Sequence, residues 1–476
     1  MTDLLSLDAA AVLTAFADRR LSPVEYFDAV TRRIELWEPH ISALYAYDPE
    51  GACAAAKASE ARWAKGAPTG PLDGLPVTVK ELIATEGTPI PLGTAATTLL
   101  PAAVDAPSAA RLREAGAILF AKTTCPDFGM LSSGLSTFHK LTRNPWNLAR
   151  NPGGSSAGAG AAAAAGYGPL HLGTDIGGSV RLPANWCGLF GLKPSNGRIP
   201  IDPYYVGRSA GPMTRSVADA ALMMPVLSLP DARDAISLPY EALAWGDFAV
   251  DVSGLRIGLM LDAGCGLPVD DSVRAVAEAA ARRFEAVGAR IVEVPGVLTR
   301  TMLDGLDDFW RAKFWGDMAL LDEAARGRVL PAITEWAERG GRLSGVEVAR
   351  GFNRTLDMAR ACAALFQEVD VVLSPTAPVV HYPAEWPSPT NDPAGRPFEH
   401  IAFTVPWNMS GQPAASINAG FTPDGFPIGM QIVGPRFGDL LVMRLSKLFE
   451  SWRAPIRWPE PPRAVAAAPQ DAFLPA

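Results

Sequence analysis

The stretch "GLRIGLMLDAGCGLPVDDSVRAVAEAAARRFEAVGARIVEV" (254–294) decides the fold class. It begins with an apolar run at 254–261 and ends with another at 290–294, and both runs are typical of buried strands. Between them, apolar residues repeat at helical spacing up to a stop signal at Gly288. These residues are Val273, Val276, Ala277, Ala280, Phe284 and Val287. A strand–helix–strand unit joins parallel strands, so we expect an α/β protein with a partly parallel sheet.

Other strands and helices are expected on both sides of this unit. Short apolar runs typical of strands lie at 74–82, 117–123, 168–175, 369–378 and 427–435. Residues 301–366 look mostly helical, and a further helix is expected near 438–452. "SPVE" (22–25) predicts a capping box with Ser22 as N-cap, and Ser6 is the expected cap of an earlier helix.

The domain organisation looks simple. We find no internal repeat and no convincing linker, so residues 1–453 are expected to form one domain. Its motifs lie at about 70–220, and a helical region at about 300–366 is expected to vary between related proteins and to shape a substrate site. Residues 454–476 form a tail rich in Pro and Ala, which we expect to be poorly ordered.

Composition and charge disfavour several classes of protein. Of the 476 residues, 48% are hydrophobic, which is enough for a large core. The formal net charge is −8 and no basic stripe follows the chain, so nucleic-acid binding is not expected. No stretch offers ~18 strongly apolar residues, so no membrane span is expected, and the first 20 residues do not look like a signal peptide.

Cysteine and histidine spacing argues against a metal or a disulfide framework. The five cysteines are scattered and form no CxxC motif, which favours a reducing cytoplasm. The five histidines show no HExxH spacing, so a metal site is not expected. His139 is expected on the surface of a loop.

Two glycine-rich segments carry serines that could do chemistry. "RNPGGSSAGAGAAAAAG" (150–166) places Ser155 and Ser156 beside almost no other side chains. In "GTDIGGSVR" (173–181), two glycines let consecutive N–H groups turn toward one point. The N–H groups of Ile176, Gly177, Gly178 and Ser179 are the expected oxyanion donors. Ser179 would stand beside these donors as a nucleophile.

A serine nucleophile needs a base, and no histidine occupies a matching motif. A buried, neutral lysine can serve instead if its pKa falls from ~10.4 toward ~7–8. Lys80 follows the apolar run "LPVTV", where such burial is plausible. "GSSAG" (154–158) also fits the nucleophile elbow around Ser156. That elbow requires a strand before it, but the preceding residues look like loop, so we expect Ser156 to support the site instead.

The motifs together resemble those of the amidase signature family. The segments that carry the resemblance are "GPLDGLPVTVKE" (70–81), "TRNPWN" (142–147), "PGGSSAGAGAAAAAG" (152–166), "LGTDIGGSVRLPANWCGLFGLKPSNGRI" (172–199), "GPMTRSVADAALMM" (211–224), "TVPWNMSGQPAASI" (404–417) and "PIGMQIVGP" (427–435). The spacings from Lys80 to Ser155 and from Ser155 to Ser179 also match the family. The resemblance runs from about residue 6 to about residue 452.

The resemblance implies a role for each of the matching residues. Ser179 would be the nucleophile, Ser155 a bridging serine that follows a cis peptide bond, and Lys80 the base. Gly129 and Ser155 would line the acyl site. Four further residues are expected to support the site: Ser156, Thr174, Asp175 and Arg181. Asp175 and Arg181 would form an ion pair.

The same resemblance implies an α/β/α sandwich around a central mixed β-sheet and a cofactor-free amidase that works through an acyl-enzyme. Its partner would be a small-molecule amide, ester or carbamate (urethane), and a homodimer remains open. Here Ala157 and Ala159 replace residues that are often Gly and Ser, and Glu81 stands where Asp is common. These departures leave the triad intact.

Two other functions stay open. The chain could be the A subunit of a glutamine-dependent tRNA amidotransferase, which would pass ammonia to a partner. It could also be a catalytically inactive homologue that keeps the fold for binding. Segments 200–210, 300–345 and 379–400 are expected to shape the pocket. The aromatic residues at 309–315 belong either to the core or to an apolar substrate funnel.

Overall fold

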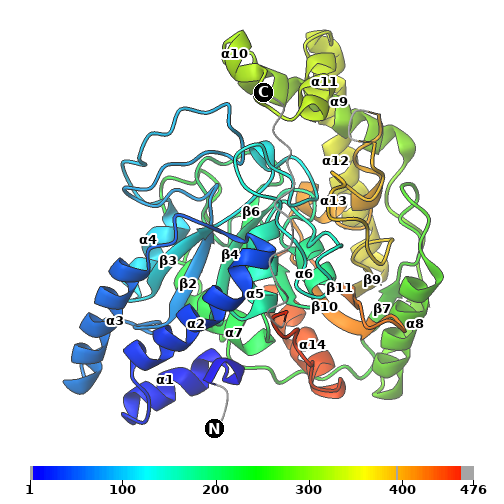
Figure 1. Ribbon diagram of the computed structural model, residues 1–476. Coiled ribbons are helices and arrows are strands. Elements are labelled where there is room, and N and C mark those ends of the chain that lie inside the picture. Colours follow the sequence, from blue (N-terminus) through cyan, green and yellow to red (C-terminus); the bar gives the residue numbers. More distant parts are fainter. Residues whose placement is uncertain (1–3, 393–394, 463–476) are drawn as a thin grey trace.

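A computed structural model describes residues 4–392 and 395–462. Its strands join one eleven-stranded sheet in the order β1-β3-β2-β4-β6-β5-β10-β11-β9-β7-β8 (Figure 1). The strands are β1 Leu44–Tyr45, β2 Pro76–Lys80, β3 Ile118–Thr123, β4 Leu170–Asp175, β5 Phe190–Lys193, β6 Ser209–Thr214, β7 Arg256–Leu259, β8 Arg290–Glu293, β9 Val371–Pro375, β10 Ala414–Phe421 and β11 Pro427–Val433.

The sheet is mixed, as expected. Strand β2 runs parallel to β3 and β4 at one end, and β7 runs parallel to β8 and β9 at the other. The strands between these groups pair antiparallel, from β4 through β6, β5, β10 and β11 to β9. The strand–helix–strand prediction for 254–294 is therefore confirmed. Strands β6 and β10 were not predicted because their sequences are rich in small residues, and β1 and β5 were not predicted because they are too short to show a pattern.

Helices cover both faces of the sheet (Figure 1). They are α1 Ala9–Ala17, α2 Pro23–Ile41, α3 Pro49–Ala64, α4 Pro107–Glu114, α5 Ala157–Ala165, α6 Arg181–Cys187, α7 Val217–Leu227, α8 Asp271–Ala286, α9 Arg300–Met318, α10 Glu323–Arg326, α11 Pro331–Gly340, α12 Gly345–Glu368, α13 Val405–Met409 and α14 Asp439–Trp452. Helices α5 and α6 pack on one face, and α7, α14 and α8 pack on the other. This is the predicted layered α/β/α arrangement.

The helix ends follow local capping rules with one correction. Ser22 caps α2 in a complete capping box with Glu25, as predicted. The expected cap at Ser6 is wrong. Asp8 caps α1 by accepting a hydrogen bond from the Ala11 N–H, and Ser6 ends a short 3₁₀ turn.

Helix α5 is buried along its whole length. Its small side chains let it lie very close to the ends of the neighbouring strands. A Cβ atom at Gly158 would lie 2.3 Å from the carbonyl oxygen of Ala43 and 2.4 Å from the Thr124 amide nitrogen. The small-residue stretch at 157–165 is thus explained by packing of the helix that follows Ser155 and Ser156.

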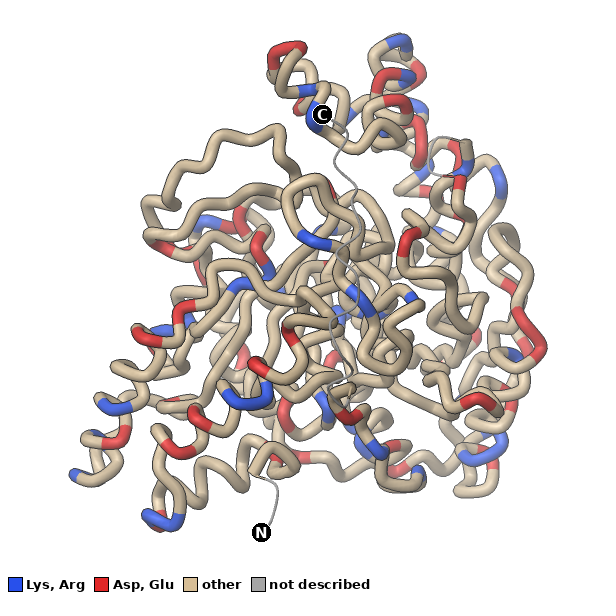
Figure 2. Tube along the Cα trace, viewed as in Figure 1, with Lys and Arg blue, Asp and Glu red and all other residues tan. Residues whose placement is uncertain are grey.

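The predicted helical region at 300–366 contains α9, α11 and α12, with the short α10 between them. Figure 1 shows α9, α10 and α11 grouped together, away from α1 and α3. None of the helices in the described part of the chain is long and apolar enough to cross a bilayer. Figure 2 shows Lys and Arg interspersed with Asp and Glu along the trace.

Part of the predicted tail is described. Residues 454–462 contain neither a helix nor a strand, yet Trp458 packs on Trp146 at 6.1 Å between ring centroids. The Arg215 guanidinium lies 4.4 Å from the centre of a Trp458 ring. This part of the tail therefore packs against the body of the protein through Trp458. Residues 463–476 lie outside the described residues, and a single domain over 1–453 stays a prediction.

Candidate active site

The parallel strands β2 and β4 bring two sequence motifs to one edge of the sheet. Lys80 is the last residue of β2, and Asp175 is the last residue of β4. Because parallel strands end at the same edge, the glycine-rich loop after Asp175 lies beside Lys80. The loop that precedes α5 supplies Ser155 to the same place.

Lys80 and Ser155 are in direct contact. Nζ of Lys80 donates a hydrogen bond to Oγ of Ser155 at 2.8 Å, and the lysine side chain is completely buried. Burial lowers the pKa of Lys80 to about 8, because an ammonium is poorly solvated there. The Gly154–Ser155 peptide bond is cis, as the family resemblance implies.

Ser179 lies on the adjoining loop, and the backbone ties it to the Ser155 segment. The Ser156 N–H donates to the carbonyl oxygen of Ser179 at 3.3 Å. Ser155 and Ser179 line the same pocket. No hydrogen bond joins their two hydroxyls among the described residues, so the contact that would complete the predicted triad is not made in this conformation.

The N–H groups expected to bind an oxyanion are not all available. The Gly178 N–H donates to Oδ1 of Asp175 at 2.8 Å, so it is occupied, which corrects the expectation for this residue. The N–H groups of Ile176, Gly177 and Ser179 donate to no acceptor in the described part of the chain. Thr404 steadies this loop by donating from Oγ1 to the Gly177 carbonyl oxygen at 2.5 Å.

A buried charge network fixes the start of the loop. Arg181 donates from Nη2 to Oδ1 of Asp175 at 2.9 Å, and neither side chain is exposed. The expected ion pair is therefore present. Burial raises the pKa of Asp175, but the Arg181 charge and hydrogen bonds from Arg181 and Asn408 outweigh it, so the net pKa shift is downward. Arg181 also donates to Gln431 Oε1 at 2.7 Å and to Asn408 Oδ1 at 2.6 Å.

Ser156 holds the Ser155 segment against β4. Its hydroxyl donates to the Thr174 carbonyl oxygen at 3.1 Å and accepts from the Thr174 N–H at 3.3 Å. Ser156 is completely buried. Both of its contacts are to β4, so its position fits the supporting role expected for Ser156 and Thr174 rather than that of an exposed nucleophile.

Gly129 lies in the short 3₁₀ turn that follows β3, beside Leu82 and Ser155. It has a φ of +67°, and a Cβ atom there would lie 2.8 Å from Leu82 Cδ1 and 3.4 Å from Ser155 Oγ. A side chain at this position would therefore intrude on the bridging serine. Glycine both permits the backbone conformation and keeps the space beside Ser155 open.

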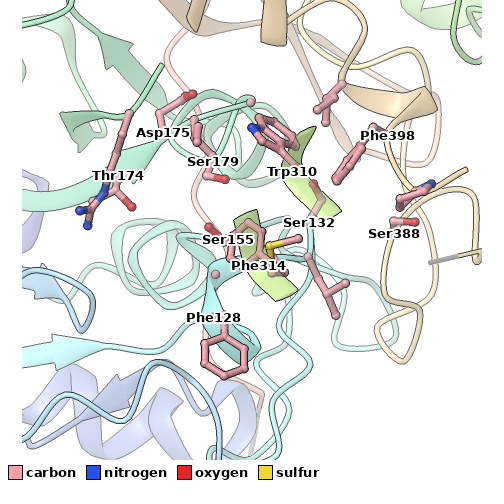
Figure 3. A pocket seen from close by; sticks show the side chains of 18 of the residues that line it. Phe128, Ser132, Ser155, Thr174, Asp175, Ser179, Trp310, Phe314, Ser388 and Phe398 are labelled. Carbon is pink, nitrogen blue, oxygen red and sulfur yellow. The ribbon is translucent and has the colours of Figure 1, made fainter. Parts of the chain in front are cut away.

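These segments surround one pocket, with a volume of about 780 Å³ including its open mouth. Figure 3 shows Ser155 and Ser179 near the middle of the view, between Thr174 on the left and Phe398 and Ser388 on the right. All three segments expected to shape the pocket contribute to its wall. Their residues there are Tyr205, Arg208, Trp310, Phe314, Ser388, Pro397, Phe398 and His400. Trp310 and Phe314 thus line the pocket, whereas Phe309 packs against Phe352.

A buried polar cluster lies behind Lys80 and was missed in the sequence. Glu81 accepts a hydrogen bond from the Cys125 thiol at 3.0 Å and contacts Nε2 of His139. The side chain of His139 is only 6% exposed, so the expectation that it lies on the surface is wrong. Its position in a polar loop gave no sign that Glu81 would contact it. Across the described ranges, no group of three His, Cys, Asp or Glu side chains is placed to hold a metal ion.

Comparisons with known proteins extend this description. Residues 25–443 match the family model named Amidase. The chain is 35% identical to an acylamidase of Rhodococcus erythropolis over 94% of this chain and 95% of that one. It is 33% identical to the A subunit of the glutamyl-tRNA(Gln) amidotransferase of Chloroflexus aggregans, over 94% and 97%. A bacterial aryl acylamidase of the amidase signature family has a similar structure, with a TM-score of 0.85, 29% identity and coverage of 94% and 96%.

Proposed function

The chain belongs to the amidase family and is a hydrolase of the amidohydrolase class, and from this premise we propose that it cleaves carboxylic amides through an acyl-enzyme formed on Ser179. The observation that carries the proposal is the 2.8 Å contact between Nζ of a fully buried Lys80 and Oγ of Ser155. A lysine whose pKa is lowered to about 8 is largely neutral in mildly alkaline solution, so it can accept a proton.

The first half of the reaction transfers a proton away from the nucleophile. Ser155 passes its hydroxyl proton to Nζ of neutral Lys80 and takes the proton of Ser179. Oγ of Ser179 then forms a bond to the amide carbon. The carbonyl oxygen gains the negative charge, and the free N–H groups of Ile176, Gly177 and Ser179 stabilise it. This step requires the Ser179 hydroxyl to turn toward Ser155, which the Ser156–Ser179 backbone hydrogen bond keeps close.

The second half releases both products. The Lys80 ammonium returns its proton through Ser155 to the amine nitrogen, and the C–N bond breaks. Water then attacks the Ser179 ester and gives a proton to the same relay. The relay returns this proton to Oγ of Ser179 as the bond from Oγ to the acyl carbon breaks, which frees the carboxylic acid and restores the serine hydroxyl. Esters and carbamates pass through equivalent tetrahedral intermediates, so we include them among the substrates.

The test combines covalent labelling with turnover. A sulfonyl fluoride should modify Ser179, and peptide mass spectrometry should locate the added group there. The purified chain alone should hydrolyse aryl amides, and both properties should be absent in Ser179→Ala. Hydrolysis at normal rate by Ser179→Ala, or labelling at Ser156 in place of Ser179, would contradict the proposal.

The relationship to the amidotransferase relative supports a second candidate function. In that case the chain would release ammonia from glutamine and deliver it within a complex. The aromatic pocket wall formed by Trp310, Phe314 and Phe398 favours the first candidate, because apolar rings fit aryl amides better than a small polar substrate. Glutamine hydrolysis that requires a second chain, without turnover of aryl amides, would decide for the amidotransferase.

We also place the enzyme in the cytoplasm. The described cysteines Cys53, Cys125, Cys187, Cys265 and Cys362 are all free thiols, which supports a reducing compartment.

A further inference from the structure

Arg208 is a cation in the wall of the pocket that the proposed reaction does not use. Only 6% of the residue is exposed, and it lines the same pocket as Ser155 and Ser179. No carboxylate among the described residues lies within ion-pair distance of it. Its guanidinium donates from Nη1 to the Pro203 carbonyl oxygen and lies 5.1 Å from the centre of the Tyr205 ring. The other N–H groups of this side chain donate to no protein acceptor in the described chain.

The backbone places Arg208 close to the reacting groups. The next residue, Ser209, begins β6 and lies directly opposite Asp175 at the end of β4. Arg208 therefore stands where the glycine-rich loop with Ile176, Gly177 and Ser179 begins. Burial is the main cause that lowers the pKa of Lys80, and the positive charge of Arg208 lowers it further. This effect agrees with a position of Arg208 near Lys80.

No other charged group in the described pocket wall neutralises the positive charge of Arg208. Asp175, the one carboxylate in the described pocket wall, is bound by Arg181. Lys313 lies 4.5 Å from the Tyr205 ring but is paired with Asp317 at 3.1 Å and does not line the pocket. A buried guanidinium without a carboxylate is costly, and its planar N–H groups match a carboxylate well.

We propose that Arg208 binds a carboxylate of the substrate, so that the preferred amides are anionic molecules with a carboxylate a few bonds from the scissile amide. This inference rests on the proposed amidase function, since it assigns the substrate class of the same pocket. The aromatic side chains Trp310, Phe314 and Phe398 would enclose the apolar part of such a substrate. Arg208 would act in binding, and the proton relay would remain with Lys80 and Ser155.

The first experiment measures binding without turnover, in the Ser179→Ala background. Two pairs of probes differ only in charge, because a methyl ketone replaces the carboxylate. On the amine side they are 4-(butanoylamino)benzoate and N-(4-acetylphenyl)butanamide. On the acyl side they are N-phenylsuccinamate and 4-oxo-N-phenylpentanamide. Calorimetry gives Kd for each probe before and after Arg208→Met, which keeps the apolar stem of the side chain.

We expect tighter binding of the anion in one pair, and a loss of about 10- to 100-fold for that anion in Arg208→Met. Binding of its neutral partner should change less than about threefold, which also shows that the variant folds. Arg208→Lys should keep part of the preference because it retains the charge without the planar fork. The matched control Lys313→Met removes the other cation near the Tyr205 ring and should leave both Kd values unchanged.

The outcomes separate this inference from the proposed function. Equal losses for anion and ketone in Arg208→Met, or no preference for the anion in either pair, would overturn the role of Arg208. Turnover of neutral aryl amides by the enzyme with Ser179 intact would still uphold the amidase function. Conversely, an anion preference that depends on Arg208 without turnover of any amide would uphold the binding site and overturn the proposed chemistry.

Discussion

The polar wall of the pocket (Ser155 and Thr174–Ser179) and the aromatic wall (Trp310, Phe314 and Phe398) are held in place in different ways. Behind the polar wall, Asp175, Arg181 and Asn408 are buried and joined by hydrogen bonds. The aromatic wall is held by ring contacts, such as Trp310 against Phe398 at 4.9 Å. Hydrogen-bonded networks fix one geometry, whereas ring packing tolerates adjustment. The difference suggests that the chemistry is set by one wall and the choice of substrate by the other.

The largest effect should come from the nucleophile on the polar wall. We expect Ser179→Ala to lower kcat for an aryl amide by at least about 10⁴-fold, because no acyl-enzyme can form. The melting temperature should stay close to that of the parent, since the Ser179 hydroxyl has no hydrogen-bond partner among the described residues. Steady-state kinetics and thermal melting check both statements. A loss of kcat below tenfold would show that Ser179 is not the nucleophile, and the chemistry could then not be assigned to the polar wall.

A second test measures how an added methyl group beside Ser155 changes activity. Gly129→Ala should reduce kcat/KM by about 10- to 100-fold, because the methyl group meets Leu82 and approaches Ser155, on which the relay depends. Gly87→Ala is a matched control, since Gly87 has a φ of +79° but nothing within 4 Å of the added carbon. The control carries the same kind of backbone strain and should keep its activity. Similar losses of activity in both variants would indicate general destabilisation.

The pH profile tests the base behind the polar wall. Below a pH of about 8, Lys80 gains a proton and can no longer accept one, so kcat/KM should fall about tenfold per pH unit. Above that pKa the profile should reach a plateau. The charge of Arg208 lowers the pKa of Lys80, so Arg208→Met should move this limb to higher pH. A flat profile down to pH 5 in the parent enzyme would contradict a neutral lysine.

The smallest effect is expected on the aromatic wall. Phe314→Leu should lower kcat/KM for aryl amides by about 3- to 10-fold, mainly through KM, because ring contacts to the substrate are lost. A short aliphatic amide should be affected less. The matched control is Phe309→Leu. Phe309 also lies on α9, but it packs against Phe352 and does not line this pocket, so the kinetics of the variant should match those of the parent. A kcat loss as large as that of Gly129→Ala would remove the distinction between the walls.

Much of the sheet could be predicted from the sequence, but β1, β5, β6 and β10 could not. The runs that form β2, β3, β7 and β9 are rich in large apolar residues, because buried parallel strands need no polar face. By contrast, β6 has the sequence "SAGPMT" and β5 has "FGLK". The small residues and proline of β6 carry little strand signal, and the four residues of β5 are too few to show a pattern, although tertiary packing makes strands of both.

The candidate site was predictable where two residues lie close in sequence, as Asp175 and Arg181 do, or where the family resemblance pairs distant residues, as it does for Lys80 and Ser155. The position of Asp175 and Arg181 and the contact between Lys80 and Ser155 agree with the motifs. The direction of the Gly178 N–H could not be predicted, because it depends on where the Asp175 carboxylate points. Thr404 and Asn408 lie more than 200 residues from the loop that they hold, so no local pattern indicated their contacts.

The tight burial of α5 has a consequence for protein engineering. Replacing a glycine inside a helix by alanine ordinarily stabilises a protein by up to ~1 kcal/mol, so Gly158 and Gly160 look like obvious targets for thermostabilisation. Here the new methyl group at Gly158 would collide with main-chain atoms at 2.3 Å, and the one at Gly160 would press on Pro183 at 2.9 Å. Replacing these two glycines by alanine would thus lower the stability of the enzyme. Stabilising changes are better sought on exposed surfaces such as that of α3.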